Sequence, residues 1–378
     1  MRSRPSVCSN KQSDLSNFVI FYKVETRGSF FTVTCSGLSV VATHACGWPN
    51  LTKLDNGDLF CVYFNAPSHG LMQGDLVCSK RKSNETKWKR ISIVSKRPPN
   101  GNRMHLSVGQ AHNGDLLCFS SGFILKAEKF VGFAGHWLSR SMDGGLTWDE
   151  EKHPTIPQKL KSCIPYGRII RIGKTTLAYS CYQSQGRGEP SESWVCFSDD
   201  DGLTWKRFYK LGRNDSNEVA LCSLPNGNLL AAVRTHVDHH LKVCEFSLTG
   251  KRSIEKGAVS LPMQHPADLI QVGSNCLLMT YGLRNRGLMG LAVRVSLDFG
   301  QTWLPPCTIH QFGDKATDVG YPSTVCLDKK GTLETVYYTD FEPNLTAKPN
   351  CYRVISKKWF LKDWMHPDHF VKISFANN

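Results

Sequence analysis

Hydrophobic and polar positions alternate along most of the chain, and one arrangement of them occurs six times. Each copy has an apolar alternating run, then a turn, and then a leucine that begins a second apolar run. Alternation with a period of two is typical of β-strands, and Asn-Gly or Lys-Gly at the turn is typical of hairpins. The pattern therefore predicts six β-hairpin units and almost no helix. The leucines after the turns, which are about 55 residues apart, are Leu59, Leu116, Leu177, Leu229, Leu277 and Leu333.

A second motif, S-x-D-x-G-x-T-W, follows three of these hairpins, at 141–148, 198–205 and 296–303. Its chemistry is that of a tight turn. Aspartate accepts backbone N–H groups, glycine adopts a positive φ, and tryptophan offers a large face for packing on a neighbouring unit. We therefore interpret these aspartates as structural residues.

The composition narrows the possible classes of protein. The 378 residues are enough for a large core, and no apolar run approaches the length of a membrane span. The net charge is +14, but the Lys and Arg residues are spread along the chain, so we expect no nucleic-acid partner and favour a basic pocket for an anionic small molecule or glycan.

The 15 cysteines include no CxxC pair, and many of them lie inside apolar runs, which suggests small buried hydrophobes. A reduced compartment fits this usage, and residues 1–18 contain no apolar core of a secretory signal. We predict a soluble, cytoplasmic protein. A secreted mature form with disulfides is the open alternative.

The S-x-D-x-G-x-T-W motif is the Asp-box, and residues 40–360 resemble the sialidase superfamily. The resemblance implies an all-β fold, a six-bladed β-propeller with four-stranded antiparallel blades. Residues 18–45 and 350–361 would pair to close the ring. The predicted boundaries are a peripheral segment at 1–17, one propeller domain at 18–361 and a tail at 362–378.

In such a propeller, the first residues of the six repeats would line one central pocket. We predict that this pocket binds substrate. Its members include aromatic and titratable residues, namely Trp48, Asn50, Arg103, His105, Tyr166, Arg168, Asn217, Glu218, His265, Asp268 and Tyr321.

Segments of the chain resemble the family's catalytic segments. VGYPS is similar to the segment around the nucleophile, which implies Tyr321, and NEVALCSLPNGNLLAAVR implies Glu218 as its base and Arg234 as a carboxylate clamp. A neutral phenol avoids repulsion from the carboxylate of the substrate, and its high pKa explains why an adjacent base is needed. The stretch YGLRNRGLMG resembles the segment of the third arginine, which leaves Arg284 and Arg286 as candidates.

Two positions depart from the family pattern. Gly47 stands where the first of three carboxylate-binding arginines is expected, and no aspartate occurs near residues 68–70, where the acid is expected. His69 is our candidate for the proton transfer, and Asp75 is a weaker one.

Three functions are compatible with these residues. We favour an exo-acting glycoside hydrolase of sialidase type that releases a terminal acidic sugar from a glycan. The alternatives are a uronate-cleaving lyase on the same fold, in which histidine or tyrosine abstracts a proton, and a non-catalytic propeller that binds a glycan or a protein. We predict no cofactor and no metal, and the sequence does not indicate an oligomeric state.

Overall fold

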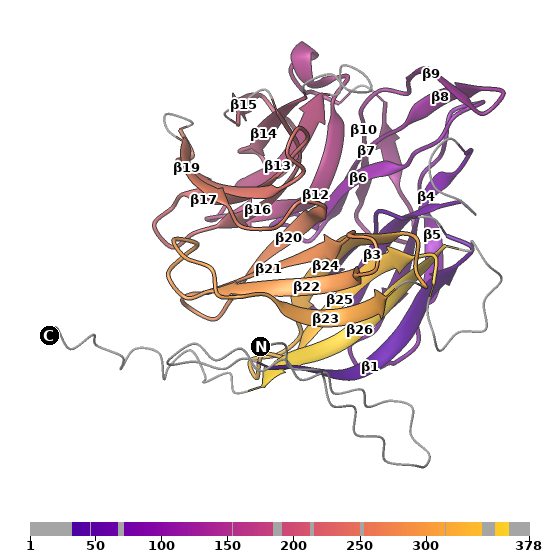
Figure 1. The fold of residues 1–378 in the computed structure, drawn as a ribbon. Helices are drawn as coiled ribbons and strands as arrows, with labels where there is room; N and C mark the ends of the chain where they lie inside the picture. Colours follow the sequence, from indigo (N-terminus) through magenta and orange to yellow (C-terminus); the bar gives the residue numbers. More distant parts are fainter. Residues whose placement is uncertain are drawn as a thin grey trace, which may run out of the picture.

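The computed structural model describes residues 32–45, 47–66, 72–152, 154–183, 191–211, 215–249, 253–313, 315–341 and 352–362. Their strands form six four-stranded antiparallel blades (Figure 1). Blades 2 and 3 also share one parallel pairing, Arg168 with Val108, which joins them into an eight-stranded sheet. The innermost strands of successive blades contact one another, and the sixth contacts the first, so the blades form a closed ring. The predicted all-β, six-bladed propeller is confirmed.

The first three blades lie in chain order around the ring. From the innermost strand outward they consist of β2 (Asn50–Lys53), β3 (Leu59–Asn65), β4 (Asp75–Arg81) and β5 (Lys89–Ser95); β6 (His105–Gln110), β7 (Leu116–Ser121), β10 (Trp137–Ser141) and β11 (Asp149–Glu151); and β12 (Ile164–Ile172), β13 (Thr176–Gln183), β14 (Glu192–Ser198) and β15 (Arg207–Lys210). A separate hairpin, β8 (Phe123–Lys126) and β9 (Lys129–Phe133), is inserted in blade 2.

The last three blades complete the ring in the same order. They consist of β16 (Ser216–Ser223), β17 (Leu229–Thr235), β18 (Leu241–Phe246) and β19 (Ser253–Ala258); β20 (Gln264–Val272), β21 (Cys276–Leu283), β22 (Met289–Ser296) and β23 (Cys307–Gly313); and β24 (Val319–Cys326), β25 (Leu333–Thr339), β26 (Arg353–Lys362) and β1 (Thr32–Thr43).

Blade 6 combines both ends of the described chain. Its outermost strand, β1, pairs antiparallel with β26 from Thr32–Lys362 to Thr43–Arg353. This pairing satisfies the backbone groups of β26 that would otherwise form an open edge. Because the chain runs on from β1 into blade 1, it also links blade 6 covalently to blade 1. This is the closure expected from the sequence, seen for residues 32–43 and 353–362. The outer boundaries, at 17 and 361, stay predictions.

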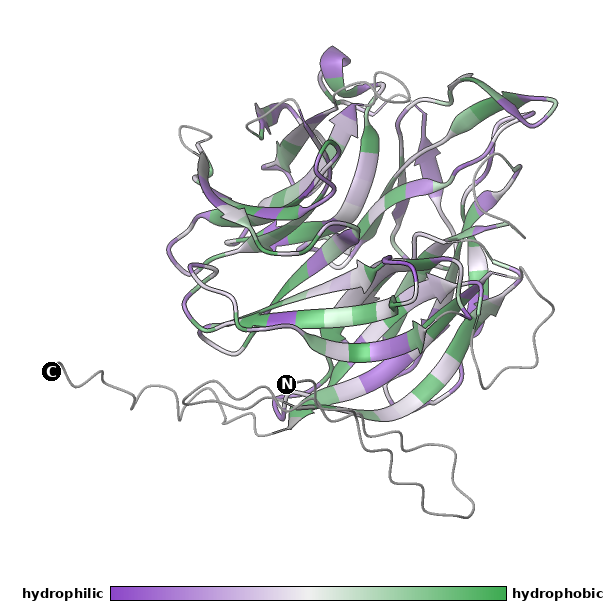
Figure 2. Cartoon of the chain, viewed as in Figure 1, coloured by the Kyte–Doolittle hydropathy of each residue, from purple (hydrophilic) through white to green (hydrophobic). Residues whose placement is uncertain are grey.

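The hydrophobic core lies between the blades. All six leucines that follow the repeat turns are buried, because each is the first or second residue of the second strand of a blade, which neighbouring blades cover on both faces. Apolar segments therefore run along the strands in the interior, and polar segments gather at turns (Figure 2). The described cysteines are free thiols. Nine of them are buried, eight within strands, as small apolar residues would be.

The Asp-boxes form the expected turns at the ends of three blades. In the third, Asp298 accepts the hydroxyl of Ser296 at 2.8 Å, the backbone N–H of Thr302 at 2.9 Å and its hydroxyl at 2.6 Å. Each box also packs on the preceding blade. A Cβ on Gly202, for example, which has a φ of 87°, would lie 2.4 Å from Leu117 in blade 2.

Removing the carboxylate of a box should weaken the fold without touching the central pocket. We expect Asp298→Ala to lower the free energy of unfolding by about 1–2 kcal/mol at pH 7, because a turn loses three hydrogen bonds. Burial opposes ionisation, but the bonds from Thr302 and Ser296 outweigh it and lower the pKa of Asp298. Its stabilisation is therefore present above the unfolded pKa, near 4, and is lost as the pH falls through the lower folded pKa.

Urea unfolding at pH 7 and at decreasing pH measures this effect. Gln301→Ala is the control, because Gln301 is an exposed residue of the same turn. Equal unfolding free energies for the two variants at pH 7 would contradict a structural role for Asp298.

Helix is almost absent from the described residues. They contain the 3₁₀ turn η1 (Gln158–Leu160), and none of their helices is long and apolar enough to cross a membrane. No group of three or more His, Cys, Asp or Glu side chains in the same residues is arranged to hold a metal ion.

Candidate functional site

Tyr321 lies near the start of β24, the innermost strand of blade 6. Its φ is 52°, a left-handed conformation that is unfavourable for a bulky side chain. The register of β24 shifts between Gly320 and Ser323, so the strand is irregular where the tyrosine stands. The side chain is 9% exposed, and its hydroxyl donates to Oε1 of Glu218. The backbone irregularity therefore presents a buried phenol to a carboxylate from blade 4.

Glu218 connects Tyr321 to Arg234. It lies on β16, which bulges between Ser216 and Val219, and Arg234 lies on the adjacent strand β17. Oε1 of Glu218 accepts the phenol, and Oε2 accepts Nη1 of Arg234. Sixteen residues separate Glu218 from Arg234 and 103 separate it from Tyr321. The fold thus brings the three residues implied by the resemblance into one hydrogen-bonded chain.

The electrostatics keep this chain in one protonation state. Burial raises the pKa of Tyr321, and the negative charge of Glu218 raises it further. Burial alone would lower the pKa of Arg234, but Glu218 and Tyr321 outweigh burial and raise it. At neutral pH the site therefore presents the neutral phenol of Tyr321 to the carboxylate of Glu218, which the guanidinium group of Arg234 holds in place. This is the arrangement that a tyrosine nucleophile with an adjacent base requires.

Arg284 provides a second guanidinium group nearby. Its Nη2 lies 2.8 Å from Oδ1 of Asp318, and Asp318 also accepts the hydroxyls of Tyr338 at 3.1 Å and Tyr352 at 3.2 Å. Burial opposes the charge of Arg284, but Tyr338 and Asp318 outweigh burial and raise its pKa. Arg286, the other candidate, is exposed in the turn that follows β21.

Two cavities are lined by members of the Tyr321–Glu218–Arg234 chain. The smaller, about 20 Å³, has room for roughly one water molecule. Its walls include Trp48, Asn50, His105, Tyr166, Glu218, Asp268 and Tyr321. The larger, about 320 Å³, is lined by Arg234, His239, Met263, His265, Arg284, Met289, Thr317 and Asp318. Both candidate clamp arginines thus face one cavity, and the phenol faces the other.

His265 is a buried histidine in the wall of the larger cavity. Its side chain is 1% exposed, and neither ring nitrogen has a hydrogen-bond partner among the described residues. Burial lowers its pKa to about 2, and the positive charges of Arg234 and Arg284 act in the same direction. A neutral imidazole therefore stands beside both guanidinium groups. The exposed His239 lies next to it, with ring centroids 6.2 Å apart.

Arg168 reaches from blade 3 across the centre of the ring to residues of blades 5 and 6. Its Nη2 contacts Oδ2 of Asp268 at 2.6 Å, the hydroxyl of Ser323 at 3.2 Å and the carbonyl of Thr324. It also lines a cavity of about 380 Å³ that Tyr321 does not reach. Arg168 therefore joins blades 3, 5 and 6.

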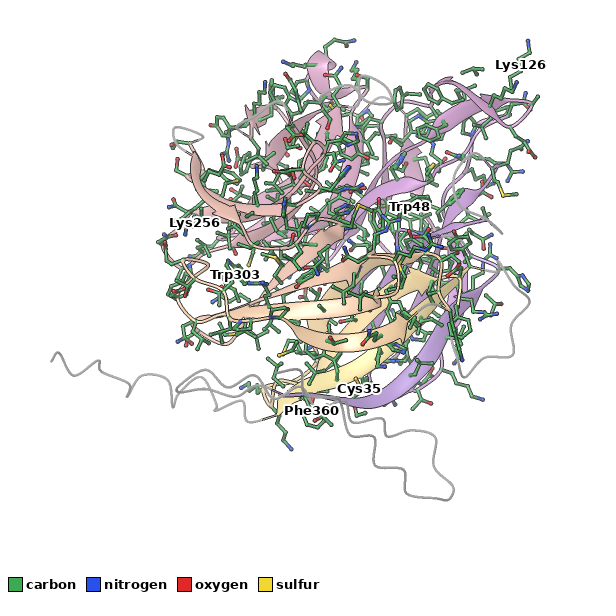
Figure 3. The ribbon with its side chains drawn as sticks, viewed as in Figure 1. Cys35, Trp48, Lys126, Lys256, Trp303 and Phe360 are labelled. Carbon is green, nitrogen blue, oxygen red and sulfur yellow. The ribbon has the colours of Figure 1, made fainter. Side chains whose placement is uncertain are left out.

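Aromatic rings surround the Tyr321 side chain. Tyr166 meets it edge-on at 6.1 Å between centroids and donates its hydroxyl to the carbonyl of Ala267 at 2.8 Å. Trp48, labelled in Figure 3, meets it edge-on at 5.8 Å. Gly47, which occupies the expected arginine position, has a φ of 46°, and a Cβ there would lie 3.2 Å from the ring of Tyr338. Tyrosine rings thus occupy the space next to the missing first arginine.

Five residues predicted for the site line neither of the two site cavities, and His69 lies outside the described residues. The five are Arg168 and Arg286, described above, with Asn217, Arg103 and Asp75. Arg103 is fully buried under Trp137 and donates to the carbonyls of Ala134 and Gly135. Asp75 lies at a separate surface cavity and accepts the backbone N–H of Arg97 at 2.8 Å. His69 falls outside the described residues, so its position relative to Tyr321 stays a prediction.

The sequence argument missed Asp318 and Tyr338. Asp318 is the anion that holds Arg284, and Tyr338 packs its ring 5.8 Å from that of Tyr321. Asp318 lies three residues before Tyr321, in Asp-Val-Gly-Tyr, and this proximity was an available signal. Tyr338 lies in β25, all of whose residues are buried, so nothing distinguishes a site residue from a core residue.

The fold and the repeated turn motif define a class, a six-bladed β-propeller with Asp-boxes. The sequence matches the family described as "BNR repeat-like domain" over residues 57–334, and the chain belongs to that family. A search of curated proteins found no match.

Solved structures share the fold at low sequence identity. A protein of unknown function from Dyadobacter fermentans is 22% identical with a TM-score of 0.70, and the match covers 87% of this chain and 99% of that one. The Hadza microbial sialidase Hz136 is 15% identical with a TM-score of 0.68, over 85% of this chain and 69% of that one. A mutant of the NanB sialidase from Streptococcus pneumoniae is 10% identical with a TM-score of 0.65, over 89% and 71%.

Proposed function

We propose that the protein is a glycoside hydrolase of sialidase type that releases a terminal acidic sugar from a glycan. The observation that carries this proposal is the hydrogen-bonded chain from Tyr321 through Glu218 to Arg234. A buried tyrosine that donates to a buried, arginine-held carboxylate costs stability, because charges are removed from water. A nucleophile and its base make use of the same arrangement.

The carboxylate of the substrate would bind between Arg234 and Arg284. Each of these residues contacts its own carboxylate through one terminal nitrogen, and a guanidinium group has five N–H donors, so donors remain for a ligand. A carboxylate bound between these two arginines would place the anomeric carbon of the sugar towards Tyr321. Two charge-assisted contacts fix the orientation of the sugar and leave the phenol free to react.

The chemistry follows from these positions. Tyr321 Oη forms a bond to the anomeric carbon while its proton passes to Glu218, and the bond from that carbon to the leaving oxygen breaks. The leaving oxygen takes a proton from an acid, for which His69 is the candidate from the sequence. Water then attacks the same carbon and gives a proton to the acid deprotonated in the first step. The bond from that carbon to Tyr321 Oη breaks, and Glu218 returns its proton to the tyrosine. Two displacements at one carbon give retention of configuration.

Product analysis tests the proposed reaction. We expect incubation with glycosides of N-acetylneuraminic acid, a deaminated keto-sugar acid and glucuronic acid to release one free acidic sugar, detected by mass spectrometry. Addition of one water to the substrate mass identifies hydrolysis. Binding of one of these glycosides without any release would contradict it and favour a non-catalytic propeller.

His265 favours a second reaction, elimination by a uronate-cleaving lyase. The ring nitrogens of His265 have no partner among the described residues and lie at the cavity that both arginines line, where the imidazole could abstract the proton next to a carboxylate while arginine neutralises that carboxylate. Elimination would give an unsaturated product that absorbs ultraviolet light, without addition of water. His265→Gln would then abolish turnover, whereas under hydrolysis Tyr321→Phe would do so.

A further inference from the structure

The β8–β9 hairpin is an insertion that projects from blade 2, at the upper right of Figure 1. Its turn, Lys126-Ala127-Glu128-Lys129, has positive φ values of 49° at Ala127 and 59° at Glu128, as a two-residue hairpin turn requires. The four-stranded pattern of the blade does not include these strands. The hairpin is therefore an addition to the propeller, and its role must be sought on its surface.

Three phenylalanines gather on this hairpin. The ring centroids of Phe123 and Phe130 are 5.1 Å apart, those of Phe123 and Phe133 are 5.8 Å apart, and those of Phe130 and Phe133 are 5.2 Å apart. Phe130 is 47% exposed and Phe133 is 37% exposed. Figure 2 shows hydrophobic segments along the strands and a hydrophilic tip. Exposed apolar groups that gather in this way mark interaction sites.

The base of the hairpin is firmly attached. Asn102 accepts the N–H of Phe123 through its side chain at 2.9 Å, and the N–H of Leu125 donates to the carbonyl of Asn100 at 2.6 Å. On the return strand, Arg103 donates to the carbonyls of Ala134 and Gly135. The buried Arg103 thus positions this insertion. Such anchoring holds the phenylalanines in place relative to the blade.

A series of ring contacts leads from the candidate nucleophile to the hairpin. The ring of Tyr321 meets that of Trp48 at 5.8 Å, Trp48 meets His105 at 6.1 Å, and His105 meets Phe123 at 5.2 Å. His105 and Trp48 both line the smaller cavity. Figure 3 labels Trp48 in the centre of the molecule and Lys126 at the far end of the hairpin. The exposed rings are therefore continuous with the candidate site.

We propose that the β8–β9 hairpin is a leaving-group-side subsite for an extended glycan. Sugar rings beyond the scissile bond would lay their C–H faces on Phe130 and Phe133, and Lys126 and Lys129 would contact anionic groups of the same glycan. The subsite deepens the proposed function and rests on it, because it names the substrate as an oligosaccharide and not a small glycoside. Aromatic side chains supply apolar faces of this kind at a small entropic cost.

The tip of the hairpin argues against a membrane or a second copy as the occupant. Insertion into a bilayer would place the outermost residues in lipid, and here these are Lys126, Glu128 and Lys129, which are charged. A stable dimer needs roughly 800 Å² from each partner, and two half-exposed rings with Val131 supply only a small part of that area.

The test compares a long and a short substrate. For Phe130→Ala/Phe133→Ala we expect kcat/KM for a sialylated tetrasaccharide to fall about tenfold, because two ring contacts are lost. For the methylumbelliferyl glycoside of the same sugar, which is too short to reach the hairpin, we expect a change of less than about twofold. Leu203→Ala removes another exposed apolar side chain, which is 64% exposed, and serves as the matched control.

Binding measurements separate failure of the subsite from failure of the proposed function. If the wild type cleaves both substrates and the double variant cleaves them equally well, the subsite is wrong and the hydrolase proposal stands. If the wild type cleaves neither, but binds the tetrasaccharide in calorimetry more tightly than the double variant does, the hydrolase proposal and the leaving-group side fail, and the hairpin stands only as a glycan-binding site. Three results would overturn the subsite. The first is that the double variant loses binding to phosphatidylserine vesicles while its tetrasaccharide binding is unchanged. The second is a change of mass in sedimentation caused by the double variant, and the third is that the wild type does not bind the tetrasaccharide.

Discussion

Tyr321→Phe should reduce kcat for the acidic glycoside by about 10³-fold or more, because the variant has no nucleophilic oxygen. In energy this is roughly 4 kcal/mol of lost transition-state stabilisation. KM should change little, since Arg234 and Arg284 hold the substrate and neither depends on the phenol for its ion pair. Initial rates with purified variant protein give both parameters.

Two variants show whether the loss arises from chemistry or from folding. Tyr63→Phe also removes one buried phenol that makes a hydrogen bond, at 3.0 Å to Ser79, but it lies within blade 1. It should retain activity. The single variant Glu218→Gln should also lower kcat, as Tyr321→Phe does, since the phenol then donates to an amide that cannot take its proton. Near-normal kcat in Tyr321→Phe would exclude the tyrosine mechanism.

The repeat pattern predicted six hairpin units, and the resemblance carried by the Asp-boxes assigned them to a propeller. Period-two alternation, Asn-Gly turns and three Asp-boxes are local signals, and each specifies one hairpin or one turn. Six such units at nearly constant spacing have few ways to bury both faces of their second strands, and a closed ring is one of them. The inserted β8–β9 hairpin was not predicted, because its strands interrupt the repeat and carry no turn glycine.

The site was only partly predictable, because its contacts join residues that are far apart in the chain. Resemblance located Tyr321, Glu218 and Arg234, and the fold brings them together. The place of Arg103 at the start of the second repeat suggested that it faces the pocket, but a start position does not determine which way a side chain points. Arg103 instead reaches the carbonyls at the base of the hairpin.

The charges of the site also differ from what a count of arginines suggests. Arg168, Arg234 and Arg284 each have a carboxylate partner, namely Asp268, Glu218 and Asp318. Before substrate binds, these three pairs add no net charge to the channel. Selection of an anion would therefore depend on the remaining guanidinium donors and their geometry more than on the +14 charge of the chain.

Glu334→Ala should lower the free energy of unfolding by about 3–5 kcal/mol, because it leaves a buried cation without its partner. Glu334 lies fully buried on β25 and accepts both terminal nitrogens of Arg81, one at 2.7 Å, and the hydroxyl of Ser356. Arg81 belongs to blade 1 and Glu334 to blade 6. The ion pair therefore spans the interface at which the ring closes, and its loss should loosen that interface first.

Replacing both partners separates the cost of an unpaired charge from the value of the pair. Arg81→Met/Glu334→Leu should recover most of the lost stability, since apolar side chains of similar size can replace a buried ion pair at little cost. Glu85→Ala removes one partner of the exposed pair with Lys89 and should change the unfolding free energy by less than about 1 kcal/mol. Urea unfolding of the three variants measures the order of their unfolding free energies. If Glu334→Ala unfolds at the same urea concentration as Glu85→Ala, blade 6 is not held to blade 1 by this pair, and β1 pairing with β26 alone closes the ring.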